Sequence, residues 1–154
     1  MLVRRFRLAD TDQTHAIYVA AVREGTQRFY SAAQREAWAP NDTPPPDWRD
    51  RLADAVAYVA EDQGTLQGFA SMTHDGHLDF LYVAPALMGT GVADALYDSL
   101  MADPALATRT DFEVQASHFS RRFLLKKGWQ DAPPETVERF SEQLTVFPMR
   151  YTRP

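Results

Sequence analysis

The chain has 154 residues, of which 45% are hydrophobic and 24% are charged, so it is long enough for one domain, over 1–154, with a buried core. Its formal net charge of −5 argues against a nucleic-acid partner, because proteins that follow phosphate backbones normally carry a basic patch. The absence of cysteine excludes a disulfide scaffold, a thiol nucleophile and a cysteine-based metal site. No segment has the pattern of a signal peptide or a membrane span, so we expect a cytoplasmic protein without a membrane partner.

The predicted strands and helices follow one another along the chain in the order β-α-α-α-β-β-β-α-β-α-β-β. The predicted strands are 2–8 (an edge strand), 55–61, 66–73, 77–83, 111–116, 129–139 and 143–152. The predicted helices are 13–23, 32–38, 46–52, 92–101 and 117–127. Asp10 or Thr11 is expected to cap the first helix, Ser31 the second, and Gly128 is expected to end the last. This order predicts an α/β fold, in which a mixed sheet of about seven strands carries helices on its faces.

The most informative segment joins the fourth predicted strand to the fourth predicted helix. Pro85 stops the strand, Gly89 and Gly91 follow, and helical spacing begins at Val92. The first amides of a helix lack partners within it, and the helix dipole favours an anion there. Glycines also let the backbone come close to a phosphate. The segment therefore predicts a site for a cofactor with a pyrophosphate, with a plain strand-to-helix turn as the structural alternative.

Two motifs resemble those of the GNAT superfamily of acyl-CoA-dependent N-acetyltransferases. The family loop Gln/Arg-x-x-Gly-x-Gly/Ala is matched at 88–93, where Gly91 and Ala93 hold the small positions and Met88 replaces the Gln or Arg. The family segment Asn/Ser-x-x-Ala-x-x-Phe-Tyr-x-x-x-Gly-Phe is matched at 117–129, with Leu124 in place of the tyrosine. The segments 30–39 and 147–151 look like those of the small bacterial YafP-type members. The resemblance covers nearly the whole chain, and two motifs in the right order are much more specific than one glycine loop.

The resemblance implies a GNAT fold in which acetyl-CoA is the cosubstrate. It implies direct transfer, in a ternary complex, of the acetyl group to a primary amine of a small molecule or peptide. The loop amides would hold the pyrophosphate, and pantetheine would run between two splayed strands. The implied cofactor contacts are Leu81, Tyr82, Val83, Met88, Gly89, Thr90, Gly91, Val92, Ala93, Ser117 and Ser120. Ser117 also stands where a helix N-cap is expected, and Lys126 and Lys127 need no ligand to explain them in a last helical turn.

For the chemistry, the resemblance implies that the backbone amide of Val83 donates to the oxyanion. Asp79 is the candidate base, acting through water, because it is a carboxylate in an apolar strand where burial favours proton uptake. The alternatives for Asp79 are a cap of the neighbouring hairpin or an ion pair with an arginine. Glu113, on the neighbouring strand, is a weaker candidate for the base.

The family's usual general acid is the tyrosine that Leu124 replaces. The thiolate of coenzyme A leaves tolerably well near neutral pH, so turnover need not require this acid. Tyr82, Tyr97 or a water molecule are candidates to substitute for it, with core packing as the alternative for both tyrosines. Tyr30 and Trp38 are the candidates for the wall of the acceptor pocket.

Two further functions remain open from the sequence. A non-catalytic acyl-CoA-binding or regulatory module would keep the cleft and lack the acid, and a nucleotide-binding protein would use the glycine loop alone. No metal is expected, because His15, His74, His77 and His118 do not form a ligand set. A homodimer is possible by analogy with relatives.

Overall fold

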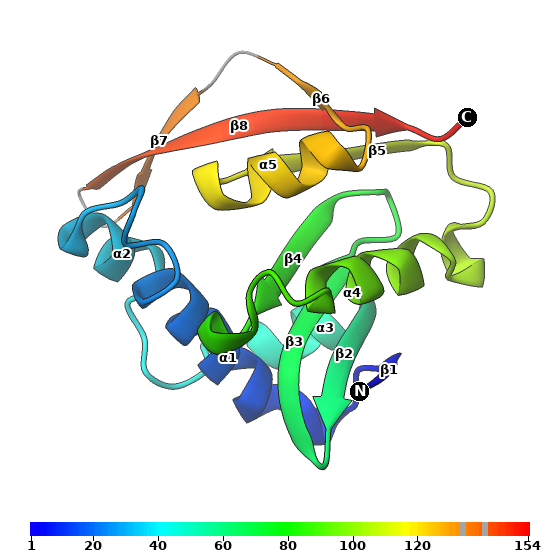
Figure 1. The fold of residues 1–154 in the computed structure, drawn as a ribbon, viewed down its shortest axis with the longest axis horizontal. Coiled ribbons are helices and arrows are strands. Elements are labelled where there is room, and N and C mark those ends of the chain that lie inside the picture. Colours follow the sequence, from blue (N-terminus) through cyan, green and yellow to red (C-terminus); the bar gives the residue numbers. More distant parts are fainter. Residues whose placement is uncertain (133–134, 140–141) are drawn as a thin grey trace.

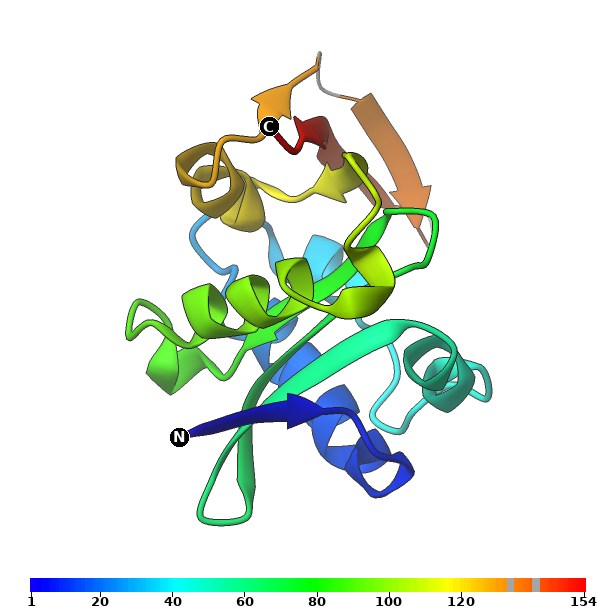
Figure 2. The ribbon, with the colours of Figure 1, turned by 90° about the vertical axis from the view of Figure 1, so that its right-hand side faces the viewer.

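The computed structural model describes residues 1–132, 135–139 and 142–154. Its strands form two sheets that occupy the two halves of the molecule, the C-terminal one uppermost in Figures 1 and 2. The first sheet has the order β1-β2-β3-β4, made of β1 (Leu2–Arg5), β2 (Val56–Asp62), β3 (Thr65–Met72) and β4 (Leu78–Val83). The second has the order β5-β8-β6, with β7 also paired to β8, made of β5 (Asp111–Ala116), β6 (Gln130–Asp131), β7 (Glu135–Arg139) and β8 (Glu142–Thr152).

Among the residues that the structure describes, one parallel bridge joins the two sheets. His77 faces Glu113 there, and the amide of Glu113 donates to the carbonyl of Gly76 at 2.9 Å. All the strand pairs within the two sheets are antiparallel. The predicted α/β class is confirmed, but the described strands number eight and form two sheets rather than one of about seven. Beyond the bridge, β4 and β5 share no ladder, so the two strands splay apart.

The helices are α1 (Thr11–Arg23), α2 (Ala32–Trp38), α3 (Trp48–Ala53), α4 (Val92–Met101) and α5 (His118–Lys126). Three short 3-10 turns, η1 (Leu8–Asp10), η2 (Pro85–Leu87) and η3 (Pro104–Leu106), complete the order. Leu96 and Leu100 of α4 pack on one face of the first sheet, in a core that continues under α5 and the second sheet. Ile17 of α1 and Trp48 of α3 pack on the opposite face. The first sheet is therefore covered on both faces.

Several predicted boundaries are confirmed by local capping. Ser31 caps α2 by accepting from the amide of Gln34, whose side chain in turn accepts from the amide of Ser31. Ser117 caps α5 in the same way with Ser120, and Gly128 follows that helix with a φ of 90°. These capping interactions join residues close together in the chain, which explains why the sequence pattern is sufficient to predict them.

Three predicted elements are wrong in extent. The strand expected at 2–8 ends at Arg5, the helix expected from residue 46 begins at Trp48, and only Gln130–Asp131 and Glu135–Arg139 of the strand expected at 129–139 are extended in ladders. Residues 133–134 of that prediction lie outside the described residues. The turn before α3 is closed by the amide of Trp48, which donates to the carbonyl of Pro45 at 3.0 Å, so the prolines lead into the helix rather than start it.

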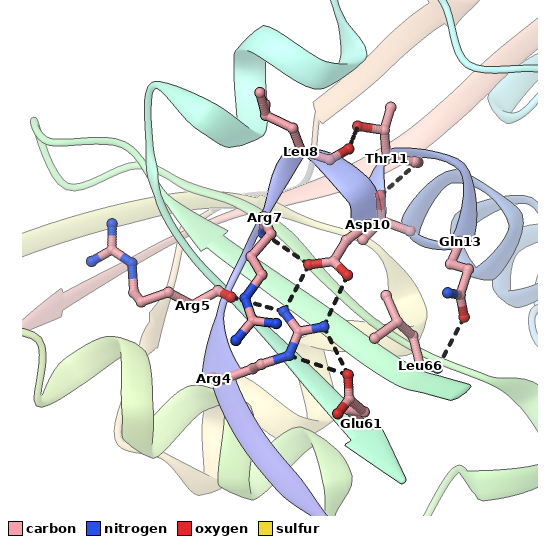
Figure 3. Close-up of polar contacts among 10 residues, drawn as sticks. Arg4, Arg5, Arg7, Leu8, Asp10, Thr11, Gln13, Glu61 and Leu66 are labelled. Atoms are coloured by element: carbon pink, nitrogen blue, oxygen red, sulfur yellow. Dashed lines mark hydrogen bonds and ion pairs between the residues drawn. The ribbon is translucent and has the colours of Figure 1, made fainter. Parts of the chain in front are cut away.

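Figure 3 shows why the first strand stops early. The guanidinium of Arg4 donates to both oxygens of Asp10, at 2.8 and 2.9 Å, and to Glu61 on β2 at 2.8 Å. The amide of Arg7 donates to Asp10 at 2.8 Å, which turns the chain into η1. Asp10 stands at the N-cap position of α1, but its carboxylate is used by these partners and makes no capping bond to the helix. Its cost of burial is offset by charge-assisted bonds.

Candidate active site

The glycine loop between η2 and α4 has the backbone of an anion site. Gly89 and Gly91 have φ values of 78° and 95°, in the left-handed region that side-chain-bearing residues rarely adopt. A Cβ at either position would meet open space, so backbone conformation rather than crowding requires the glycines. The first intrahelical bond runs from the amide of Ala95 to the carbonyl of Gly91 at 3.1 Å. The amides of Val92 and Ala93 therefore point out of the helix end without intrahelical acceptors.

Met88 packs against the end of α1. A Cβ built on Gly25 would lie 2.4 Å from its Cε, so the thioether occupies the space that glycine leaves. The side chain is half-buried beside the larger core and offers no hydrogen-bond donor to the loop. At this position the chain has a packing contact between the loop and α1.

The ladder between β3 and β4 determines which backbone groups of β4 face β5. The amide of Ala84 donates to the carbonyl of Gln67 at 2.8 Å, and Val83 lies opposite Gly68. Bonded and non-bonded pairs alternate in an antiparallel ladder, so the N–H and C=O of Val83 point away from β3, toward the splay. The backbone N–H and C=O of Leu81, which lies opposite Ala70, point away from β3 for the same reason. Tyr82 falls in a bonded pair with Phe69, so its backbone groups bond within the sheet.

A cavity of about 310 Å³ lies beside this splay. Its wall brings together parts of α1, the segment that includes α2 and α3, β4, and the junction of β5 with α5. The predicted site residues that line it are Tyr30, Trp38, Asp79, Leu81, Tyr82, Ser117, Ser120 and Leu124. Val83 and the loop at 88–93 are not part of this wall. The cavity and the exposed glycine loop at the N-terminus of α4 are therefore two separate features of the structure.

Asp79 occupies an irregular position in β4. The register pairs Met72 with Leu78 and Ser71 with Phe80, so Asp79 is the extra residue of a β-bulge, a feature that often re-aims side chains near functional sites. Both of its oxygens accept from one guanidinium nitrogen of Arg51, at 2.9 and 3.0 Å. Of the two alternatives to a base, the arginine pair is therefore present. Its side chain is 21% exposed and lines the cavity, so it also stays within reach of a bound molecule.

Tyr30 and Trp38 form one side of the cavity. Their rings meet edge to face at 5.2 Å, and the hydroxyl of Tyr30 accepts from the amide of His118, at the start of α5, at 3.0 Å. Burial raises the pKa of Tyr30, although the donating amide of His118 acts in the opposite direction. The carbonyl of Trp38 accepts from the hydroxyl of Tyr18 at 2.9 Å. The segment that carries α2 is thereby fixed to α1 and to α5, and the pocket wall is held from both sides.

Residues 21–153 match the family model described as an acetyltransferase (GNAT) domain. The chain belongs to the GNAT acetyltransferase family. It is 30% identical over 149 residues to the "uncharacterized N-acetyltransferase YafP" of Escherichia coli strain K12, covering 97% of this chain and 94% of that one. The solved GCN5-related N-acetyltransferase of Rhodopseudomonas palustris is similar at 30% identity and a TM-score of 0.89, covering 98% and 94%. The PaiA N-acetyltransferase of Thermoplasma acidophilum, solved in complex with coenzyme A, shares the fold at 15% identity and a TM-score of 0.77, over 98% of both chains.

The position of the usual GNAT acid is filled by a core residue. Leu124 is 0% exposed and lines the cavity with its apolar side chain. Tyr97 is 6% exposed, accepts from the indole nitrogen of Trp129 at 2.9 Å and is not part of the cavity wall, so its place is that of a packing residue. Tyr82 does line the cavity, 5.0 Å from the ring of Tyr18. Of the two tyrosines, Tyr82 is the one that lines the cavity.

Several other residues considered in the sequence analysis have structural partners. The hydroxyls of Ser117 and Ser120 each serve the cap of α5, and both residues also line the cavity. Lys127 pairs with Asp94 at 2.6 Å, which raises the pKa of Lys127 and explains its charge without a ligand. Glu113 is 65% exposed beside His77 and does not line the cavity. Within the described ranges, no group of three or more His, Asp or Glu side chains is arranged to hold a metal ion.

Among the cavity residues that were not predicted as site residues are four with large or polar side chains: His15, Tyr18, Trp48 and Arg51. They lie on α1 and α3, which the sequence pattern treats as helices packed on a sheet. The available signal was a polar residue on the inward face of α1, since His15 precedes Tyr18 by three residues and Val22 by seven, which is the spacing of one helix face. None of the helices in the described part of the chain combines the length and apolar content of a membrane crossing.

Proposed function

We propose that this GNAT acetyltransferase moves the acetyl group of acetyl-CoA to a primary amine of a small molecule or peptide by direct attack in a ternary complex. The observation that carries the proposal is the arrangement at β4: the N–H of Val83 faces an open splay that adjoins a lined cavity. Cosubstrate and acceptor can then approach the same strand from two sides. Direct transfer needs both reactants in near-attack positions, and no nucleophilic side chain of the protein takes part.

Acetyl-CoA is the cosubstrate, as the family membership and the PaiA complex with coenzyme A support. We assign the pyrophosphate to the amides of Val92 and Ala93, because they have no acceptor within the helix at its N-terminus. Pantetheine extends along the splay, where the backbone groups of Leu81 and Val83 can bond it as a neighbouring strand would. The amide of Val83 donates to the oxyanion that forms at the thioester carbonyl.

The acceptor enters the cavity between α1, α2 and β4. Its wall includes the aromatic rings of Tyr30 and Trp38 and also the Arg51–Asp79 ion pair. An amine bound as an ammonium must lose one proton before its lone pair can attack. Two titratable side chains of the wall, Asp79 and His15, are placed to take it.

The leaving thiolate does not depend on a tyrosine at Leu124. Its charge is tolerable near neutral pH, and Tyr82 or a water molecule can protonate it. If no amine is acetylated although acetyl-CoA binds, the chain is an acyl-CoA-binding module, for which the buried leucine at the acid position would be the signature.

The test is release of the coenzyme A thiol in the presence of phenethylamine, spermidine, glycinamide and an alanine-terminated peptide. We expect at least one amine to give release above hydrolysis, with the acetylated amine identified by mass spectrometry. Isothermal titration with coenzyme A and with ATP runs in parallel. Tight binding of coenzyme A without transfer to any amine supports the binding-module function, and binding of ATP alone supports a nucleotide-binding protein.

A further inference from the structure

His15 is a buried titratable group in the wall of the cavity. It lies on the inward face of α1 and is 3% exposed, and its ring lines the same cavity as Asp79. The ring meets the indole of Trp48 edge to face, with centroids 4.9 Å apart, and lies 6.2 Å from the ring of Tyr18. These contacts fix the plane of the imidazole without using its nitrogens.

The neighbouring polar groups find partners other than His15. The indole N–H of Trp48 donates to the hydroxyl of Thr14 at 3.1 Å, and Asp79 accepts from Arg51. None of the hydrogen bonds among the described residues uses a ring nitrogen of His15. A buried imidazole normally has a hydrogen-bond partner, so an unused one at a cavity wall indicates that a bound molecule supplies it.

The electrostatic surroundings keep this imidazole neutral at physiological pH. Burial lowers the pKa of His15 below the ordinary value of 6.5, and the charge of Arg23 lowers it further, while Asp12 and Asp42 act against them. Arg51 of α3 and Asp79 of β4, which also line the cavity, neutralise each other, and His77, just before β4, is a further titratable group of the wall. A neutral imidazole has a free lone pair, whereas the oxygens of Asp79 are already engaged by a cation.

We propose that His15 is the general base that takes the proton from the acceptor amine in this cavity. The assignment rests on the proposed acetyl transfer. One ring nitrogen of His15 accepts a proton from the bound ammonium, which leaves a neutral amine and an imidazolium. The amine nitrogen attacks the thioester carbonyl, so a C–N bond forms and the C–S bond breaks with its electron pair on the thiolate. The second proton of the nitrogen passes to the thiolate, and the imidazolium releases its proton to solvent.

The test compares kcat/KM for an acetylated acceptor, from about pH 5 to about pH 10, in the wild type, His15→Gln, Asp79→Asn and His74→Gln. His74 lies in an exposed turn outside the cavity wall and is the control for loss of a histidine. For His15→Gln we expect a loss of about 100-fold at pH 7, the usual size of a general-base contribution. We also expect the acid limb of the profile to vanish, with activity recovering toward the pKa of the free amine. Coenzyme A binding should be unchanged.

His15→Phe retains an aromatic ring against Trp48 and separates base loss from packing loss. If it melts near the wild type and remains inactive at pH 7, the base assignment is supported. A wild-type profile in His15→Gln, with the acid limb lost in Asp79→Asn, overturns it in favour of Asp79. Unchanged profiles in both variants mean that the amine is deprotonated by solvent, which also overturns it. A wild type that binds acetyl-CoA but acetylates no amine refutes the transfer function itself and is recognised before any variant is made.

Discussion

One guanidinium nitrogen of Arg51 lies 2.9 and 3.0 Å from the two oxygens of Asp79, and the same guanidinium covers the ring of Phe80 at 4.7 Å. The pair closes one side of the cavity, with Arg51 more exposed than its partner. In this pair, the guanidinium of Arg51 lies where an ammonium acceptor would enter. Replacing Arg51 by a neutral residue therefore changes the charge that a cationic substrate meets.

Arg51→Gln should lower KM for cationic amines about threefold to tenfold, because Asp79 is then left as an unpaired anion at the cavity. Stability should change by less than about 1 kcal/mol, since the pair is partly exposed. Steady-state kinetics at low and high salt, with a thermal melt, measure both effects. A KM that rises for spermidine would show that Arg51 itself holds the acceptor.

Gly91→Ala should weaken coenzyme A binding roughly tenfold, which corresponds to ~1.4 kcal/mol. Alanine avoids the φ of 95°, and any relaxation turns the loop amides away from the anion. Gly64→Ala is the matched control, because Gly64 has a φ of 82°, also faces open space and lies in the hairpin turn between β2 and β3. Both variants should lose about 1 kcal/mol of stability. Equal dissociation constants in titration calorimetry would contradict a cofactor role for the loop.

Gly25→Ala should destabilise the fold by about 1 to 3 kcal/mol, the usual cost of overpacking. The new Cβ would meet Met88 Cε at 2.4 Å and the carbonyl of Ala21 at 2.6 Å. Adding Met88→Ala removes the first clash, so the double variant should recover part of the loss. Urea unfolding of the wild type, both single variants and the double variant gives the coupling energy. If the changes in unfolding free energy of the two single variants simply add in the double variant, the thioether of Met88 does not contact Gly25.

Asp10→Asn should cost about 2 kcal/mol at neutral pH, because Arg4 is left with a weaker partner at a buried site. Burial alone would raise the pKa of Asp10, but the hydrogen bonds from Arg4 and from the amide of Arg7 hold it below the ordinary value. The group therefore adds stability above its unfolded pKa and loses it as pH falls through the lower folded pKa. Urea unfolding at about pH 7 and about pH 3 should show a smaller acid loss in Asp10→Asn than in the wild type. An equal loss of unfolding free energy in the wild type and in Asp10→Asn would show that the Arg4–Asp10 pair does not contribute to acid destabilisation.

Much of the secondary structure follows from the sequence because its causes are local. The helix at Val92–Met101 and the strand at Asp111–Ala116 are predicted with their observed bounds, and the serine cap of α5 and the left-handed Gly128 are predicted as they occur. Each depends on residues within a turn or two along the chain. Each of the two family motifs could likewise be recognised because it lies within one continuous segment of the chain.

The sequence by itself thus determined the family and the cosubstrate class, and it predicted the loop to which we assign the pyrophosphate. Only the tertiary structure decided which side chains meet in the cavity. Asp79 is paired because α3 brings Arg51 to a bulge in β4, and the first strand stops because Arg4, Asp10 and Glu61 converge from separate segments. His15 becomes a cavity residue only once α1 packs beside Trp48. Such groupings depend on packing between elements distant in the chain, and no periodicity within one element encodes them.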